Sequence, residues 1–345
     1  MRAAIFRGPG DNEVGERPDP VIHEPTDAIV RIVLACVCGS DLWYYRGESA
    51  HAVGSIGHEF IGVVEQAGAD VAAMSPGDLV VAPFIDSDMT CPHCPNGSTI
   101  SCKLGGNFGD GTIDGGQGEA VRVPLAESTL VRVPGSGHSD QTLRSLLTLS
   151  DVMATGHHAA ISAGVRPGDV VAVVGDGAVG LSAVLAASRL GAGRVIALSR
   201  HPDRQAVAKA FGATDIVAAR GDEATVAVMD LTRGIGGDAS LECAGTPQAI
   251  ATAFAIARPG STVGMVGVPH GDVPSAQTFF RNVGWRGGPA PARIYIPELL
   301  GDVLSGEINP GLVLDYETDL DHVTDAYAAM DERRAIKSLI RIGSV

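Results

Sequence analysis

The sequence predicts an α/β protein in which a mostly β domain is joined to a doubly wound parallel sheet. The chain has 345 residues, which exceeds the usual size of one domain and favours two. Residues 1 to about 150 contain short apolar or alternating runs rich in Val, Gly and Pro, which are typical of strands. From Val170 to Val268, strand-like and helix-like runs alternate with glycines at the joints, which is typical of a parallel βαβ sheet.

The composition excludes several classes of protein. With 45 glycines, 45% hydrophobic and 19% charged residues, the chain is typical of compact, turn-rich proteins rather than disordered ones. The net charge is −15 and no Lys/Arg-rich run occurs, so we expect neither a nucleic-acid nor a membrane partner. No leader-like or membrane-spanning apolar run is found, which predicts a cytoplasmic protein.

The first domain is predicted to span residues 1–152. Its expected elements share short apolar patterns bounded by turn residues. They are strands over 1–7, 28–35, 60–65 and 78–83 and a helix over 143–149.

The second domain, predicted over 153–287, carries a dinucleotide-binding pattern. A buried strand from Asp169 runs into Gly175-x-Gly177-x-x-Gly180, and an apolar helix follows. The first glycine makes a tight turn, the second lets backbone N–H groups approach a pyrophosphate, and the third permits close helix–strand packing. The residues predicted to bind the cofactor here are Gly175, Gly177, Ala178, Val179 and Gly180.

The end of the next strand, 194–198, bears on cofactor choice. An acid that accepts the ribose 2′-hydroxyl normally stands there, but this chain has Ser199 and Arg200, with Arg204 following. A hydroxyl and guanidinium groups can bind a 2′-phosphate, so NADP(H) is predicted over NAD(H). The alternative is that Arg200 is a surface charge stacked on adenine and that NAD(H) is still accepted.

The closing segment, 288–345, is predicted to return to the first domain. A Pro-rich turn at 288–291 precedes two expected helices, 296–304 and 321–329. The apolar run 336–342 is predicted to rejoin a sheet.

The six cysteines favour metal ligation in a reducing compartment over disulfides, with Cys36 and Cys243 interpreted as packing residues. Cys38 and His58 both lie in glycine-flanked segments, and a thiolate with an imidazole suits a catalytic zinc ion that keeps one position open. Taken singly, each of these residues is more often a packing residue.

A longer string of residues resolves that ambiguity. Gly57-His-Glu-Phe-Ile-Gly62, followed by Gly68 and Val71, resembles the signature of zinc-containing alcohol dehydrogenases of the medium-chain dehydrogenase/reductase family. Cys38-Gly-Ser-Asp41, Ser75-Pro-Gly-Asp78, the 175–180 turn and Val266-Gly-Val-Pro269 occur in that family's order. The resemblance implies a GroES-like β domain and a Rossmann domain.

The resemblance also assigns roles in a catalytic zinc site. It implies Cys38, His58 and Asp151 as ligands, with Glu59 either ligating the ion or exchanging with water. Asp41 is expected to hold the other ring nitrogen of His58, or alternatively to cap a helix starting at Leu42.

Further residues are assigned around the reacting atoms. Ser40 is expected to begin a proton relay whose next member is open, because Trp43 replaces the relatives' histidine and His51, ribose hydroxyls or water remain as substitutes. Thr155 is expected to press the nicotinamide toward the zinc. The carboxamide-binding residues implied are Val266, Gly267 and Val268.

A second, structural zinc lobe is implied by Asp88-x-x-Cys91-x-x-Cys94-x₇-Cys102. The family places four cysteines at these intervals, and an aspartate takes the first position here, which softness arguments make a weaker donor. His93 as a replacement donor and an unmetallated loop are the alternatives.

Together these features predict a reversible hydride transfer between NADP(H) and an alcohol and its aldehyde or ketone. The alternatives are an NAD-dependent polyol or formaldehyde dehydrogenase and a non-catalytic nucleotide-binding relative. Trp43, Tyr44 and Phe108 are expected to line an apolar substrate pocket, and 105–118 is a candidate lid. The resemblance also implies a homodimer or homotetramer.

Overall fold

The computed structural model describes residues 1–345, which divide into two units. Unit 1 contains residues 1–151 and 291–345, and unit 2 contains residues 152–290. The chain therefore leaves unit 1 once and returns to it. The predicted α/β class is confirmed, with antiparallel β structure dominating unit 1 and a parallel sheet forming unit 2.

Two sheets form unit 1. The smaller has the order β2-β1-β4, and the larger, seven-stranded sheet has the order β15-β16-β3-β5-β6-β8 with β7 paired to β3. The strands are β1 (Arg2–Gly8), β2 (Asp11–Glu16), β3 (Ala28–Cys36), β4 (Gly54–Ser55), β5 (Glu59–Ala67), β6 (Leu79–Ala82), β7 (Ala120–Val123), β8 (Val131–Arg132), β15 (Tyr316–Asp319) and β16 (Ser338–Arg341).

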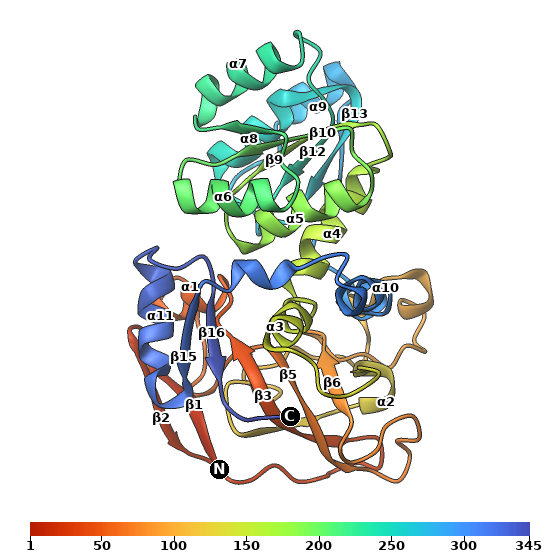
Figure 1. Cartoon of the computed structure of the whole chain (residues 1–345), viewed down its shortest axis with the longest axis vertical. Coiled ribbons are helices and arrows are strands. Elements are labelled where there is room, and N and C mark those ends of the chain that lie inside the picture. The colour runs from red at the N-terminus through yellow and green to blue at the C-terminus, as the bar shows by residue number, and fades with distance from the viewer. The chain divides into compact units, whose positions relative to one another are not determined.

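Short helices complete unit 1. They are α1 (Asp41–Tyr45), η1 (Cys94–Asn96), η2 (Thr99–Ser101), α2 (Ala126–Thr129), α3 (Asp140–Thr148), α10 (Ala292–Ser305), η3 (Pro310–Val313), η4 (Leu320–His322) and α11 (Val323–Asp331). The predicted return of the chain end to a sheet is confirmed, because β16 pairs antiparallel with β3, and Figure 1 shows the two strands side by side.

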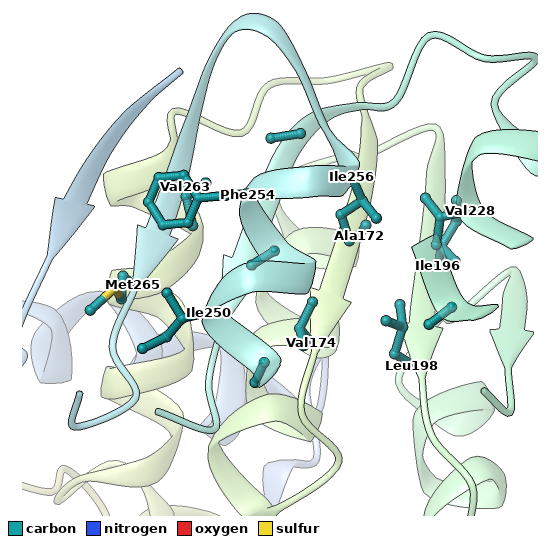
Figure 2. Close-up of a cluster of buried hydrophobic side chains, with 14 of the residues drawn as sticks. Ala172, Val174, Ile196, Leu198, Val228, Ile250, Phe254, Ile256, Val263 and Met265 are labelled. Atoms are coloured by element: carbon teal, nitrogen blue, oxygen red, sulfur yellow. The ribbon is translucent and has the colours of Figure 1, made fainter. Parts of the chain in front are cut away.

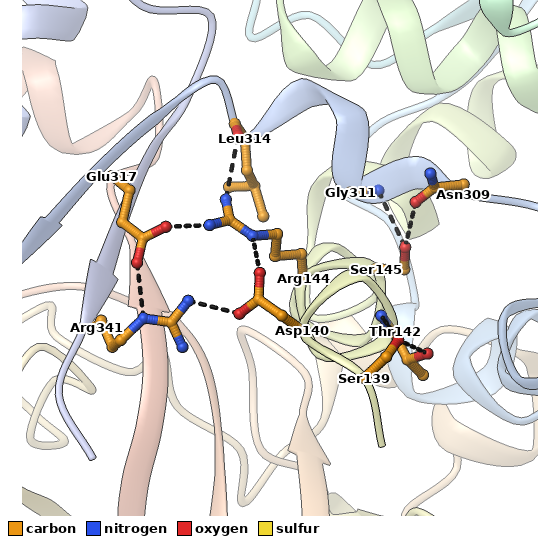
Figure 3. A network of polar contacts seen from close by, with 10 residues as sticks. All are labelled: Ser139, Asp140, Thr142, Arg144, Ser145, Asn309, Gly311, Leu314, Glu317 and Arg341. Carbon is orange, nitrogen blue, oxygen red and sulfur yellow. Dashed lines mark hydrogen bonds and ion pairs between the residues drawn. The ribbon is translucent and has the colours of Figure 1, made fainter. Parts of the chain in front are cut away.

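A ring of ion pairs ties this returning segment to α3 (Figure 3). Arg144 bonds to Asp140 at 2.6 Å and also to Glu317 of β15. Arg341 of β16 closes the ring, with 2.6 Å to Asp140 and 2.7 Å to Glu317. The α3 helix begins where the side chain of Ser139 accepts a hydrogen bond from a backbone N–H in its first turn.

In unit 2, all six strands of the sheet are parallel and follow the order β11-β10-β9-β12-β13-β14. This order reverses direction between β9 and β12, where doubly wound sheets bind nucleotides at the carboxyl ends of the strands. The elements are α4 (Val152–Ala163), β9 (Val170–Val174), α5 (Ala178–Arg189), β10 (Arg194–Leu198), α6 (Pro202–Ala210), β11 (Asp215–Val217), α7 (Gly221–Leu231), β12 (Gly237–Glu242), α8 (Pro247–Ile256), β13 (Ala257–Met265), α9 (Ser275–Arg281) and β14 (Gly284–Gly287).

The core of unit 2 lies between α8 and the sheet (Figure 2). Phe254 and Ile250 of α8 are fully buried together with Ala172 of β9 and Val263 of β13. Burying such side chains contributes about 1.5–3 kcal/mol each, which fixes the sheet that presents the nucleotide-binding edge. None of the helices in either unit has the length and apolarity that a membrane span requires.

Candidate metal and cofactor sites

The first group of candidate metal ligands lies where β3 ends and β5 begins. Cys38 follows β3, His58 and Glu59 stand at the start of β5, and Asp151 is the last residue before α4. Cys36 pairs with Glu59 in the antiparallel β3–β5 ladder, so the end of one strand is brought beside the start of the other. One donor atom from each of Cys38, His58, Glu59 and Asp151 lies within 4.8 Å of the others.

These donors suit a zinc ion by type and by charge. Asp151 Oδ2 lies 3.5 Å from Cys38 Sγ and 3.3 Å from His58 Nε2, so sulfur, nitrogen and oxygen converge on one point. Burial raises the pKa of Cys38. Burial alone lowers the pKa of His58, but the neighbouring Cys38 and Asp41 outweigh it and hold that pKa well above its ordinary value. A divalent cation would neutralise this accumulation of acidic groups.

Asp41 touches two members of this group. Its Oδ1 lies 3.5 Å from His58 Nδ1, and its Oδ2 accepts a hydrogen bond from the Cys38 backbone N–H at 2.9 Å. The expectation that Asp41 caps a helix starting at Leu42 is wrong. The helix begins at Asp41 itself, with half-buried Ser40 in the cap position, because the carboxylate turns back to Cys38 instead.

Glu59 carries a buried counter-ion that sequence reasoning missed. Its Oε1 lies 2.6 Å from Nζ of Lys337, and both side chains are almost fully buried, at 0% and 1% exposure. Lys337 also donates to the Val37 carbonyl at 3.0 Å, and the Cys36 thiol donates to Glu59 Oε2 at 3.3 Å. Cys36 is therefore more than a packing residue. The signal available in the sequence is that Lys337 stands inside the apolar run 336–342, where a charged side chain needs a partner.

Gly57 and the buried side-chain amide of Gln117 pack next to this group of ligands. Gly57 has φ +91°, and a Cβ there would lie 2.4 Å from Cγ of Gln117. Gln117 donates to the Cys36 carbonyl at 3.1 Å and accepts from the hydroxyl of Tyr327 at 2.9 Å. The side chain of Gln117 thus occupies the space that a larger residue at position 57 would need.

One expectation about the surroundings of this group is wrong, and another stays untested. Phe108 is 1% exposed and packs edge-on against Phe60 in the core of unit 1, so it does not line a substrate pocket. The rings of Tyr44 and His51 are tilted by 58° with centroids 4.6 Å apart. Both ring nitrogens of His51 lie 2.6 Å from backbone carbonyl oxygens, one of which belongs to Gly109. The segment 105–118 is thereby bonded to its neighbours, and its role as a lid stays a prediction.

The second group of candidate ligands is local in the chain. Asp88 Oδ1 lies 3.4 Å from Cys94 Sγ and 3.1 Å from Cys102 Sγ, while the Cys91 and Cys94 sulfurs are 3.5 Å apart. All four donor atoms lie within 4.8 Å of one another. His93 is exposed and belongs to neither group, so nothing in the geometry favours it over Asp88.

The pKa values in this second group are shifted in opposite directions. A backbone N–H from Lys103, aided by that of Cys94, lowers the pKa of the Cys91 thiol to about 7. Backbone N–H groups led by that of Cys91 lower the pKa of Asp88. Burial raises the pKa of Cys94 to about 12, and the neighbouring sulfurs add to the effect. Binding of a cation would stabilise all of these groups in the deprotonated form that ligation requires.

In unit 2, the predicted glycine turn joins β9 to α5. Gly177 occupies the cap position of α5, and Ala178, Val179 and Gly180 form its first turn, whose N–H groups lack intrahelical acceptors. A Cβ on Gly180 would lie 2.0 Å from the Gly175 carbonyl oxygen. The turn therefore packs as closely as a pyrophosphate-binding loop requires.

The other predicted cofactor residues lie at the same carboxyl-end edge of the sheet. Val266, Gly267 and Val268 follow β13, and the N–H groups of the first two donate to the carbonyl of Glu242 at the end of β12. The side chain of Glu242 accepts hydrogen bonds through Oε1 from the N–H groups of Ala244 and Gly245, at 2.9 and 2.7 Å, and so orders the turn that follows β12.

Ser199, Arg200 and Arg204 follow β10 as predicted, but two of them are already engaged. Ser199 and Arg204 both bond to Asp176, whereas Arg200 is exposed. Thr155 is buried in α4 at 8% exposure, and Asp151 precedes that helix rather than lying on it.

Comparisons with known proteins match both parts of the chain to known domains. Residues 24–135 match the alcohol dehydrogenase GroES-like domain, and residues 178–297 match the zinc-binding dehydrogenase domain. A probable zinc-binding alcohol dehydrogenase of Mycobacterium tuberculosis is 33% identical over 96% of this chain and 86% of its own length. The solved alcohol dehydrogenase from Thermus sp. ATN1 is 33% identical, covers 99% of this chain and 100% of its own, and superimposes with a TM-score of 0.92.

A further relative matches part of the chain. A glutathione-independent formaldehyde dehydrogenase of Pseudomonas aeruginosa is 37% identical over 61% of this chain and 57% of its own length.

Proposed function

Because the chain belongs to the zinc-containing alcohol dehydrogenases of the medium-chain dehydrogenase/reductase family, we propose that it transfers a hydride reversibly between NADP(H) and an alcohol/carbonyl pair. Membership makes the chain a zinc-dependent oxidoreductase acting on small molecules, with Zn²⁺ and a nicotinamide cofactor. The relatives that carry this assignment are named as alcohol dehydrogenases, which favours an enzyme over a non-catalytic nucleotide-binding relative.

One observation carries the proposal: the convergence of Cys38, His58, Glu59 and Asp151 within 4.8 Å. Thiolate, imidazole and carboxylate are donors that catalytic zinc sites use. We propose Cys38, His58 and Asp151 as the residues that would hold the ion. When bound, zinc supplies a Lewis acid for the substrate oxygen and the nicotinamide carries the hydride.

We propose that Glu59 lies beside these three residues without ligating the ion while its present contacts persist. Both of its oxygens are engaged, one by Lys337 at 2.6 Å and the other by Cys36 at 3.3 Å. If Glu59 ligated the ion directly, its carboxylate would lose at least one of these two contacts in a fully buried site. Asp41 is proposed to fix the tautomer of His58 through its Nδ1, and Ser40 to pass the substrate proton toward solvent.

NADP(H) is proposed as the preferred cofactor because the end of β10 presents Ser199 and Arg200 where an acid is usual. Ala178, Val179 and the three loop glycines are proposed to bind the pyrophosphate, and Val266 to Val268 the carboxamide. The four residues Asp88, Cys91, Cys94 and Cys102 are proposed to hold a second, structural zinc ion.

The second candidate is an NAD-dependent formaldehyde or polyol dehydrogenase. The similarity to a glutathione-independent formaldehyde dehydrogenase favours it. Cofactor preference separates the two candidates, because the second uses NAD(H).

A homodimer or homotetramer is proposed through the free edge of the unit 2 sheet. All four residues of β14 are exposed, including Trp285 at 50%, and α9 beside it exposes Phe279 and Phe280 at 76% and 81%. An unpaired strand next to exposed aromatic rings favours pairing with a second copy. Light scattering of the purified protein tests it, and a monomer at micromolar concentration would contradict it.

The function is tested by initial rates of NADPH and NADH oxidation with a panel of aldehydes and ketones, before and after chelation of zinc. We expect turnover that favours NADPH and is lost on chelation. His58→Ala should abolish turnover while sparing cofactor binding, and retained activity in that variant would overturn the zinc mechanism.

A further inference from the structure

Asp176 supplies a carboxylate beside the end of β10, where this sequence has Ser199 and Arg200 in place of the usual acid. It stands between the first two glycines of the nucleotide-binding turn, immediately after β9. β9 and β10 are parallel neighbours in register, with Val174 opposite Leu198. Residues just past these two strand ends therefore meet at one edge of the sheet, where an adenosine ribose binds in doubly wound folds.

The contacts of Asp176 occupy the groups that would receive a 2′-phosphate. The hydroxyl of Ser199 donates to Asp176 Oδ2 at 2.9 Å, and Nη1 of Arg204 lies 3.3 Å from Oδ1. The same Nη1 reaches the Asp176 backbone carbonyl at 3.3 Å. The pair is largely shielded from solvent, with 16% exposure for the Arg204 side chain and 15% for Asp176.

We propose that the carboxylate of Asp176 sets how strongly this pocket discriminates between NADP(H) and NAD(H). An unphosphorylated ribose can donate its 2′-hydroxyl to Asp176 while Arg204 stays paired. A 2′-phosphate must instead take Ser199 and Arg204 away from Asp176 and lie near an uncompensated carboxylate. Asp176 thus weakens the preference for NADP(H) that Arg200 and Arg204 create. It takes the role of the acid that accepts the ribose 2′-hydroxyl, although it lies in the glycine turn and not at the end of β10.

The inference rests on the proposed use of a nicotinamide dinucleotide, but not on which dinucleotide the unaltered protein prefers. It concerns the change in preference when one charge is removed. Asp176→Asn removes the charge and keeps an oxygen that can accept from Ser199. Asp203→Asn is the matched control, because it removes the same charge from an exposed position in the first turn of α6.

The test measures dissociation constants of adenosine 2′,5′-bisphosphate and of AMP by calorimetry on the zinc-loaded full chain. In Asp176→Asn, the preference for the bisphosphate should rise about tenfold, which one charge-assisted hydrogen bond to phosphate is worth. Asp203→Asn and Asp176→Glu should stay near the unaltered protein. Adding Arg204→Gln to Asp176→Asn should remove most of the gain.

The ratio of kcat/KM for NADPH and NADH should move in the same direction as the fragment constants. An unchanged ratio in Asp176→Asn, or a change equal to that in Asp203→Asn, would overturn the role of Asp176. Lack of binding by either fragment would overturn it together with the dinucleotide function. An unaltered protein that prefers NADH, with the shift still present, would refute only the proposed NADP(H) preference.

Discussion

The two groups of candidate metal ligands in unit 1 are built in opposite ways. Cys38 and Asp151 are 113 positions apart, and the β3–β5 ladder brings the segment of Cys38 beside that of His58, whereas Asp88 and Cys102 are 14 apart and close a local loop. The first group has a protein cation beside it, since Lys337 pairs with Glu59. The second has none among its contacts and is arranged by backbone N–H groups.

The geometry of the two groups has different physical origins. The sheet and the buried ion pair hold the first group in place whether or not zinc is bound. The second group gathers thiols and a carboxylate within one loop, so the zinc ion proposed for it would stabilise the lobe directly. We therefore expect the two groups to respond differently to substitution, chelation and acid.

The largest effect is expected from breaking the buried pair. Lys337→Met leaves the Glu59 carboxylate buried without its cation and should lower the free energy of unfolding by about 3–5 kcal/mol. Urea unfolding of the zinc-loaded protein measures it, and adding Glu59→Gln should restore part of the loss. Lys209→Met, at an exposed position, is the control. A loss below about 1 kcal/mol, the value of an exposed pair, would refute the role given to Lys337.

Zinc removal should separate the two groups directly. After chelation, amide hydrogen exchange should accelerate strongly across residues 88–102, because little except the metal holds that loop. The strand residues around Cys38 and His58 should keep most of their protection. Equal acceleration in both regions would contradict the contrast between them.

A smaller effect is expected from the residue that orients His58. Asp41→Asn should weaken zinc binding by about 10–100-fold, which is usual when a carboxylate behind a histidine ligand is replaced. Competition with a chromophoric chelator measures the affinity. Ser75→Ala is a control elsewhere in the same unit, and an affinity for zinc unchanged by Asp41→Asn would show that the contact with His58 does not orient the ring.

The smallest effect is expected at the exposed ring of ion pairs in Figure 3. Arg144 and Arg341 hold the pKa of Asp140 below its ordinary value, and Arg341 does the same for Glu317. Because the folded pKa values are lowered, the ring stabilises the protein above about pH 4, and this contribution is lost as the pH falls through the lowered values.

Asp140→Asn should therefore cost at most about 1 kcal/mol at neutral pH, since the pairs are solvated, and should flatten the loss of stability in acid. Thermal unfolding between neutral pH and pH 3 checks this. An acid profile that matches the unaltered protein would assign the acid sensitivity to other carboxylates.

Much of the fold followed from local patterns in the sequence. The strand 194–198 and the glycine turn at 175–180 are where the apolar runs and glycine spacing predicted them. The spacing of Asp88, Cys91, Cys94 and Cys102 predicted a cluster of metal ligands, because residues so close in the chain can meet within one loop. The register of β3 on β5, which brings Cys38 beside His58, needed the family signature as well.

Other features depended on contacts between distant segments. Lys337 and Glu59 are 278 positions apart, and no local pattern relates them. The sequence alone favours Phe108 as a pocket residue, because it does not show which way an aromatic side chain in a glycine-rich segment points. Only its packing against Phe60 in the core decided that.

By itself the sequence determined the two-part α/β architecture, the nucleotide-binding turn and the residue types available to bind zinc, since these follow from periodicity, glycine placement and side-chain chemistry. The tertiary structure alone decided which charges neutralise one another. Glu59 faces Lys337, and Asp176 holds Ser199 and Arg204. Electrostatic energy depends on distance and burial in space, and neither can be obtained from order along the chain.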